Sequence, residues 1–214
     1  MRSSAGGPAG GPGDDPGALR LGGPGDAAPA ATMHARLIAD GFLSSLGPRF
    51  LRRLYGRIVR TDGSFLLVAE CDGAPIGFIA GSLSLGRLYR SFLVRDGAGA
   101  FLSAPVRLTT ALPRVLETLR HSRGGPTTEG AELLAVAVDP AWRGRHVGQR
   151  LVAGFLHEVQ HRGVTRAHVV VGAANAAAIG MYRQAGFEPV ATFEMHRGTP
   201  SMVLETAVPA RGTP

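Results

Sequence analysis

The chain has 214 residues, 44% of them hydrophobic, which suits one domain with a full core plus tails. Its formal net charge is +7, and all 23 basic side chains are arginine, which excludes a P-loop lysine and Schiff-base chemistry on the protein's own side-chain amines. The single cysteine, Cys71, excludes an internal disulfide and favours a reducing compartment.

The two ends of the chain differ in composition from its centre. Residues 1–31 are rich in Gly, Pro and Ala, and residues 207–214 are similar, so both tails are expected to be disordered. The N-terminus has no apolar core of a signal peptide, and no apolar run is long enough to span a bilayer. We therefore expect a cytoplasmic protein with one folded domain over residues 32–206.

Two helices are expected before the first long strands. Residues 33–43 predict a short helix, and Pro48 suits the first position of a second one. The apolar residues that follow recur at helical spacing, namely Phe50, Leu51, Leu54, Tyr55, Ile58 and Val59. Arginines fall mostly on the other face of this helix, which favours a solvated surface.

A hairpin and a long polar stretch come next. The apolar runs 65–71 and 75–83 read as strands joined by Asp72-Gly73, a strong hairpin signal. Residues 84–128 then show helical spacing, with helix starts expected at Pro105 and Pro113. This helical stretch could cover a substrate site, form a homodimer contact or cap the core.

The second half of the chain alternates strands and helices. The expected elements are strand 132–138, helix 147–162, strand 167–172, helix 175–185 and a hairpin of 188–196 with 201–206. Strand, helix, strand, helix implies a parallel pair within a mixed sheet, so the predicted fold class is α/β.

The turn at residues 143–148 carries the most information. It follows an apolar strand ended by Asp139 and Pro140, and it leads into an amphipathic helix, so its backbone amides are suited to a phosphate. The turn resembles the acyl-CoA pyrophosphate loop of the GCN5-related N-acetyltransferase (GNAT) superfamily, (Arg or Gln)-x-x-Gly-x-(Gly or Ala). Arg143 and Gly148 match this signature. His146 replaces the middle glycine, which would let the backbone approach a phosphate without a Cβ.

A second motif supports the same resemblance. Asn175, Ala178, Tyr182 and Gly186-Phe187 are similar to the family's second cofactor block, Asn-x-x-Ala-x-x-x-Tyr-x-x-x-Gly-Phe. The resemblance covers roughly residues 64–206 and is strongest over 132–190. It implies the GNAT fold, a mixed central β-sheet flanked by helices, here with residues 84–128 as a helical insertion between the third and fourth strands.

The resemblance also implies an activity and a set of ligand contacts. GNAT enzymes transfer an acyl group, most often acetyl from acetyl-CoA, by direct attack of an amine, so the expected acceptor is a primary amine of a small molecule or a protein. By resemblance, backbone groups of Ala137 and Val138 pair with the pantetheine arm of the acyl-CoA and donate to the thioester oxygen. The implied cofactor-binding residues are Val136, Ala137, Val138, Arg143, Gly144, Arg145, His146, Val147, Gly148, Asn175, Ala178 and Tyr182.

Two catalytic roles follow from the resemblance. Tyr182 stands where relatives often keep the tyrosine that protonates the CoA thiolate, although a tyrosine in such a helix is often only core. Glu132 lies eleven residues before Arg143, where histone-acetylating relatives carry a catalytic glutamate, and it is the first candidate for the general base. Glu70 is a weaker one. His146 either points outward or, when protonated, pairs with a phosphate.

Two other functions remain open. A non-catalytic acyl-CoA-binding or sensor protein would share the same fold and cofactor loop. A zinc hydrolase is suggested by His157-Glu158-x-x-His161, the metalloprotease pattern that places two histidines on one helix face. Both histidines fall on the polar side of that helix, and no third ligand lies at the usual spacing, so no metal is expected. No basic motif with interleaved aromatics suggests nucleic-acid binding.

Overall fold

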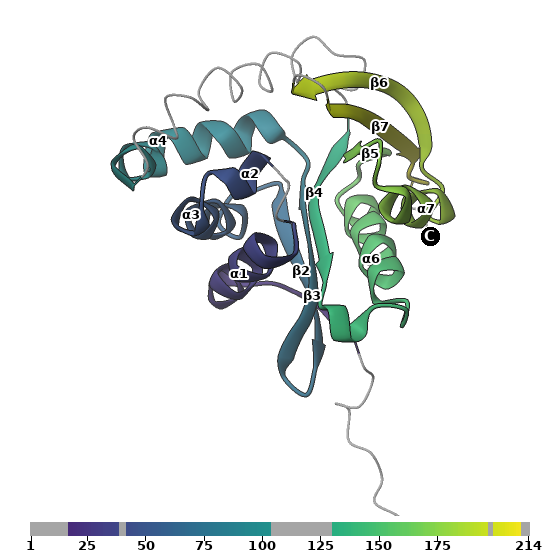
Figure 1. Cartoon of the computed structure of the whole chain (residues 1–214), viewed down its shortest axis with the longest axis horizontal. Coiled ribbons are helices and arrows are strands. Elements are labelled where there is room, and N and C mark those ends of the chain that lie inside the picture. Colours follow the sequence, from purple (N-terminus) through teal and green to yellow (C-terminus); the bar gives the residue numbers. More distant parts are fainter. Residues whose placement is uncertain (1–16, 39–41, 104–129, 197–198, 211–214) are drawn as a thin grey trace, which may run out of the picture.

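The computed structural model describes residues 17–38, 42–103, 130–196 and 199–210. A seven-stranded sheet runs through its centre, with strand order β1-β2-β3-β4-β5-β7-β6 (Figure 1). The strands are β1 (Ala18–Leu21), β2 (Ser64–Cys71), β3 (Ala74–Ser82), β4 (Ala131–Val138), β5 (Arg166–Gly172), β6 (Glu188–His196) and β7 (Thr199–Ala207). Only β4 and β5 are parallel, which confirms the predicted mixed sheet.

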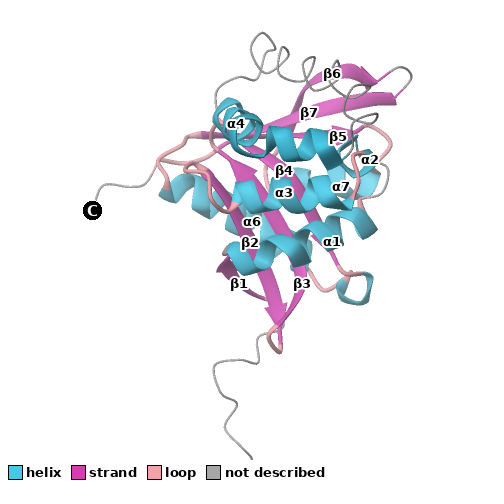
Figure 2. Ribbon diagram, turned by 90° about the vertical axis from the view of Figure 1, so that its left-hand side faces the viewer, coloured by secondary structure: helices cyan, strands magenta, loops and turns pink. Residues whose placement is uncertain are grey.

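Helices cover both faces of this sheet (Figures 1 and 2). One layer consists of α1 (Ala27–Leu37), α2 (Phe42–Ser45), α3 (Pro48–Ile58) and α4 (Leu85–Ser103), and the other of α6 (Val147–His161) and α7 (Ala176–Gln184). Two short 3-10 turns, η1 (Pro24–Asp26) and η2 (Pro140–Trp142), precede α1 and the loop before α6. None of the helices described is long and apolar enough to cross a membrane.

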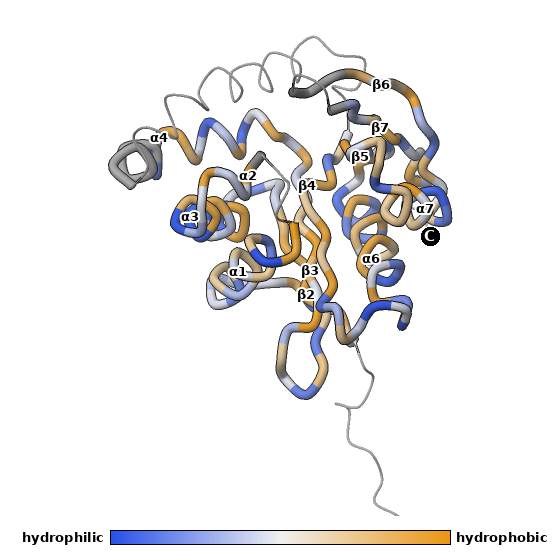
Figure 3. The backbone as a smooth tube through the Cα atoms, in the orientation of Figure 1, coloured by the Kyte–Doolittle hydropathy of each residue, from blue (hydrophilic) through white to orange (hydrophobic). Residues whose placement is uncertain are grey.

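The hydrophobic core has two parts, one on each face of the sheet, because side chains along each strand alternate between the two faces. In β2, Leu66 and Val68 face the α1–α3 layer, whereas Phe65 and Leu67 face α6, because successive strand side chains point to opposite faces. Figure 3 shows the resulting concentration of hydrophobic residues in the central strands. Both parts of the core contain buried aromatic rings. Tyr55 and Phe78 lie on the α1–α3 side of the sheet, and Phe155 and Phe187 lie on the α6 side.

Most of the predicted elements are confirmed within a few residues. Helix α3 begins at Pro48, and the β2–β3 hairpin turns at Asp72-Gly73, whose φ angles of 51° and 72° suit this tight turn. The strands and helices expected from residue 132 onward are all present. The helix predicted over 33–43 is instead α1, which begins at Ala27, followed by the short α2.

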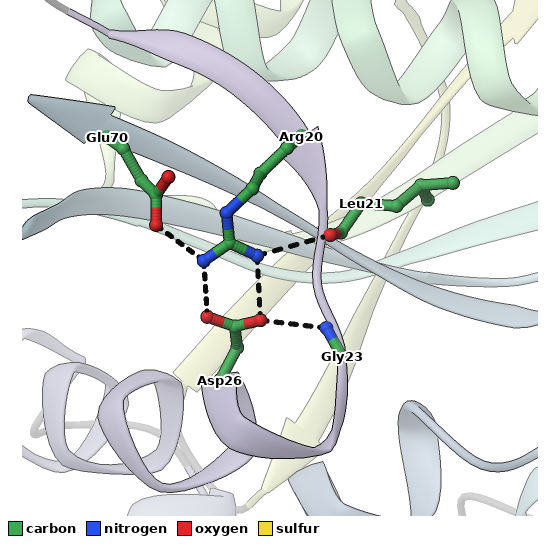
Figure 4. A network of polar contacts seen from close by, with 5 residues as sticks. All are labelled: Arg20, Leu21, Gly23, Asp26 and Glu70. Atoms are coloured by element: carbon green, nitrogen blue, oxygen red, sulfur yellow. Dashed lines mark hydrogen bonds and ion pairs between the residues drawn. The ribbon is translucent and has the colours of Figure 1, made fainter. Parts of the chain in front are cut away.

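The expectation of disorder is wrong for residues 17–31. Strand β1 pairs with β2. The guanidinium of Arg20 donates hydrogen bonds to the carboxylate oxygens of Asp26 at 2.8 and 2.7 Å and to Oε1 of Glu70 at 2.5 Å (Figure 4). Asp26 also accepts a hydrogen bond from the backbone amide of Gly23 at 2.8 Å, and the guanidinium of Arg20 lowers the pKa of both carboxyls. This order comes from long-range pairing and from small alanines of α1 that pack closely, which local composition does not reveal.

The C-terminal tail is also ordered further than expected. Strand β7 runs to Ala207, and the buried Val208 donates its amide to Thr165 O at 2.8 Å. The tail expected over 207–214 is therefore wrong for its first residues. Residues 1–16 and 211–214 lie outside the described residues.

The stretch 84–128 is described only in its first part. Helix α4 follows β3 and buries Leu88 and Phe92 against the α1–α3 layer, and Asp96 pairs with Arg57 of α3 at 2.6 Å. The helix starts expected at Pro105 and Pro113 lie outside the described residues. The described part therefore packs on the core beside α3.

Candidate functional site

The parallel strands β4 and β5 diverge. Their paired positions are Ala131 with Ala167, Glu132 with His168 and Leu133 with Val169. Beyond them β4 continues to Val138 and β5 to Gly172 without pairing to each other. The β4 edge facing β5 therefore has backbone amides and carbonyls available over 134–138, where an extended ligand could pair as a strand does.

A bulge lies where the two strands separate. On β3, Ala80 pairs with Ala135 and Gly81 with Leu133, so Leu134 is an extra residue in β4. A bulge bends its strand and increases the local twist, which directs β4 away from β5. The opening is thus built into the sheet.

The loop from β4 to α6 is held at its start by Asp139 and enters the helix through a left-handed residue. Asp139 Oδ1 accepts from Ala141 N at 3.0 Å, and Arg36 Nη2 of α1 donates to Asp139 Oδ2 at 2.5 Å, so the loop is held at its start. His146 has φ 60° and ψ 10°, the left-handed region that favours glycine. Its exposed imidazole contacts Gln149. The family's glycine at this place is therefore explained by backbone conformation as well as by the space a Cβ occupies.

The first amides of α6 are free for a ligand. The first hydrogen bond of the helix runs from Arg150 N to His146 O at 3.0 Å, so the amides of residues 147–149 have no partner within the helix. Arg143 and Arg145 are exposed beside them, and the Arg145 guanidinium lies 4.9 Å from the centre of the Trp142 ring. Amides without a partner in the helix, the positive end of the helix dipole and two exposed cations are groups that suit an anion.

Gly148 brings the two predicted motifs together. A Cβ at this residue would lie 2.9 Å from Met181 Sδ of α7, so the glycine permits α6 to begin against α7. Val136 and Val138 point to this same face of the sheet, whereas Ala137 points to the other. The residues of the first motif and those of α7 therefore meet on one side of the β4–β5 opening.

The second motif shows a capped helix and a buried phenol. Asn175 Oδ1 accepts from Ala178 N at 3.1 Å, so it is the N-cap of α7. Tyr182 is only 4% exposed and its ring packs 5.7 Å from that of Phe187, and burial raises the pKa of the Tyr182 phenol. The phenol is therefore protonated at neutral pH, as a general acid must be.

Glu132 lies on the opposite face, at the apex of the opening. Its Oε2 is 3.5 Å from Nε2 of His168 on β5, and both side chains are largely buried. Burial, and to a lesser extent the negative charge of Glu132, raises the pKa of the Tyr89 phenol in α4. The sequence did not single out His168 or Tyr89 as site residues, since neither lies in a motif with Glu132. The weaker base candidate, Glu70, is bound to Arg20.

The zinc alternative gains no support. His157 and His161 are exposed on α6, and Glu158 pairs with Arg162 at 2.6 Å. Across the part of the chain that the structure describes, no group of three or more His, Cys, Asp or Glu side chains could hold a metal ion.

Comparison with known proteins decides the family. The model of the acetyltransferase (GNAT) family matches residues 33–187. The chain belongs to the GNAT acetyltransferase family. Among solved GNAT structures, that of yncA from Salmonella typhimurium with its cofactor acetyl-CoA has a TM-score of 0.61 at 15% identity, covering 92% of this chain and 97% of that one. The ribosomal-protein-S18-alanine N-acetyltransferase from Escherichia coli has a TM-score of 0.54 at 16% identity, covering 91% and 96%. At this identity the likeness concerns the fold alone, and it confirms the predicted fold.

Curated GNAT relatives match over shorter segments. Mycothiol acetyltransferase from Cellulomonas flavigena is 35% identical over 91 residues, which are 42% of this chain and 25% of the relative. The [ribosomal protein bS18]-alanine N-acetyltransferase of Salmonella typhimurium is 40% identical over 57 residues, which are 27% of this chain and 38% of the relative. The match thus spans well under half the length of either relative.

Proposed function

We propose that this GNAT protein is an N-acetyltransferase that uses acetyl-CoA to acetylate a primary amine. The observation that carries the proposal is the β4–β5 opening, with the start of α6 and the buried phenol of Tyr182 on the same side of the sheet. Membership of the GNAT family supports the same chemistry.

The described residues fit the parts of acetyl-CoA in order. The amides at the start of α6, with Arg143 and Arg145, would hold the pyrophosphate. The unpaired edge of β4 over 136–138 would pair with the amides of the pantetheine arm. The Oδ1 of Asn175 is used for the helix cap, which leaves its Nδ2 donor for the ligand.

Acetyl-CoA supplies the thioester. The protein must deprotonate the amine, stabilise the negative charge on the thioester oxygen and protonate the departing thiolate. An acceptor ammonium has a pKa near ~10 and must lose a proton before it can attack, a role that we assign to Glu132. A β4 backbone amide would stabilise the negative charge that develops on the thioester oxygen. Tyr182 would donate a proton to the departing thiolate. The amine attacks directly, without an acyl-enzyme.

The acceptor is proposed only as a class. One relative is named for mycothiol and another for an alanine of ribosomal protein bS18, and a primary amine of a small molecule or a protein is the class that we adopt. A panel of a peptide with an N-terminal alanine, an Nα-blocked lysine peptide, glucosamine and spermidine samples this class.

The test begins with calorimetric titration of acetyl-CoA in the presence of a chelator. We expect saturable binding and release of free thiol with at least one amine of the panel. Gly148→Val should weaken binding at least about tenfold, or ~1.4 kcal/mol, because its side chain would enter the contact with Met181. Ala153→Val, at an exposed position of the same helix, is the matched control and should bind normally.

Each outcome is decisive. Binding without transfer to any amine of the panel would favour the non-catalytic acyl-CoA-binding protein over the enzyme. The absence of binding up to millimolar acetyl-CoA would contradict both functions.

A further inference from the structure

A row of polar side chains crosses the sheet at the apex of the β4–β5 opening. Successive positions on neighbouring strands β2, β3, β4, β5, β7 and β6 are register partners, namely Ser64, Ser82, Glu132, His168, Glu205 and Glu188. Register partners point to the same face, so this row faces the α4 side of the sheet. Polar side chains in a line across a sheet interior are unusual, since interior positions are normally apolar.

His168 is the buried centre of this row. Only 8% of the residue is exposed, and its neighbours in sequence, Ala167 and Val169, face the opposite core. Within the described residues the imidazole has one polar side-chain neighbour at ion-pair distance, the carboxylate of Glu132 at 3.5 Å. The histidine therefore faces the candidate base itself.

The other ionisable groups around this pair are Glu205, Glu188 and Tyr89. Glu205 of β7 is bound by Arg166 at 3.2 Å, which neutralises it. Glu188 of β6 is the register partner of Glu205, two strands from His168. From the helix layer, the phenol of Tyr89 stays protonated, because burial and then the charge of Glu132 raise its pKa. No arginine among the described residues forms an ion pair with Glu132 itself, so among these residues His168 is its one partner that can carry a positive charge.

We propose that His168 is a positioning residue for Glu132, and that the two side chains form a coupled pair which accepts the proton of the acceptor ammonium. The inference rests on the proposed function. The imidazole would orient the carboxylate and share the proton with it through Nε2, so that the pair changes from neutral histidine and carboxylate to imidazolium and carboxylate.

The step balances with one proton leaving to solvent. The acceptor R–NH3⁺ gives one proton to the pair, and its nitrogen lone pair forms the C–N bond to the thioester carbon. The C–S bond breaks, and the thiolate takes a proton by way of Tyr182 while the nitrogen loses its second proton. The products are the acetamide and the free thiol, and the proton held by the pair is then released to water.

The test compares wild type with His168→Gln, Glu132→Gln and the double variant, using acetyl-CoA and the fastest amine of the panel. Glutamine keeps a donor near the position of Nε2 but cannot take a proton. General base catalysis contributes roughly 10²–10⁴-fold, so we expect loss of a positioning residue to lower kcat about tenfold, with acetyl-CoA affinity and acceptor KM unchanged. His157→Gln, an exposed histidine of α6, is the control and should behave as wild type.

Two readouts distinguish coupling from a structural role. The double variant should lose less activity than the product of the two single losses, because residues that act as one unit are not additive. The acidic limb of the kcat profile should move to lower pH in His168→Gln, where a lone carboxylate holds the proton, persist in Glu132→Gln and disappear in the double variant.

Opposite results overturn the proposal. An unchanged kcat and pH profile in His168→Gln, or strictly additive losses, would reject the coupled pair while wild-type activity keeps the proposed function. If His168→Gln does not fold, the Glu132→Gln profile decides: an acidic limb supports the pair and a flat profile rejects it. A wild type that neither binds acetyl-CoA nor transfers acetyl groups would reject the proposed function and the pair with it.

Discussion

The buried histidine of α1 should make this protein sensitive to acid. His34 is 3% exposed, and its Nδ1 lies 2.8 Å from the hydroxyl of Tyr55. Its Nε2 is buried and has no hydrogen-bond partner among the described residues. Burial lowers the pKa of His34 to about 4, because the interior disfavours the imidazolium.

The size of the effect follows from proton linkage. A histidine with a pKa of 6.5 when unfolded and about 4 when folded stabilises the fold fully above pH 6.5, and this contribution is lost as the pH falls toward 4. The unfolded state binds the proton first, so unfolding becomes easier with acid. The loss from His34 should be about 2 kcal/mol between pH 7 and pH 5, approaching about 3 kcal/mol below pH 4.

Urea unfolding of wild type and His34→Asn at pH 7 and pH 5 measures this loss. Asparagine can place a polar atom near the position of Nδ1, opposite the Tyr55 hydroxyl, but it does not titrate. The variant should lose about 2 kcal/mol less than wild type between the two pH values. His157→Asn, at an exposed site, should keep the wild-type loss. Equal losses in His34→Asn and wild type would refute the reasoning that burial holds His34 neutral.

Two further predictions concern the cofactor site. His146→Val should lower the free energy of unfolding by about 1–2 kcal/mol, because a branched side chain tolerates the left-handed backbone poorly, while His146→Gly should retain stability and bind acetyl-CoA at least as well as wild type. Thermal melts and calorimetric titration measure both, and equal stability of the two variants would contradict the conformational argument. Tyr182→Phe should lower turnover at least about tenfold with unchanged acetyl-CoA affinity, and unchanged turnover in thiol-release assays would remove the acid role.

The sequence alone determined the local elements and the family. Helix α3 and the β2–β3 hairpin follow from short-range spacing, from Pro48 and from Asp72-Gly73, because period and turn chemistry act within a few residues. The two cofactor motifs lie in continuous segments, so their residues could be named before the structure. The family's glycine at the position of His146 was interpreted from the sequence as room for a phosphate, and only the structure showed the left-handed backbone there.

Tertiary structure alone decided the order of residues 17–31 and the surroundings of the candidate base. Strand β1 is stabilised by pairing with β2, and Arg20 reaches Glu70, which is 50 residues away along the chain. The approach of Glu132 to His168 depends on the register of two parallel strands joined through a helix. Such contacts depend on long-range pairing, which composition and periodicity do not encode, because a strand's pattern specifies which face is buried but not which strand lies beside it.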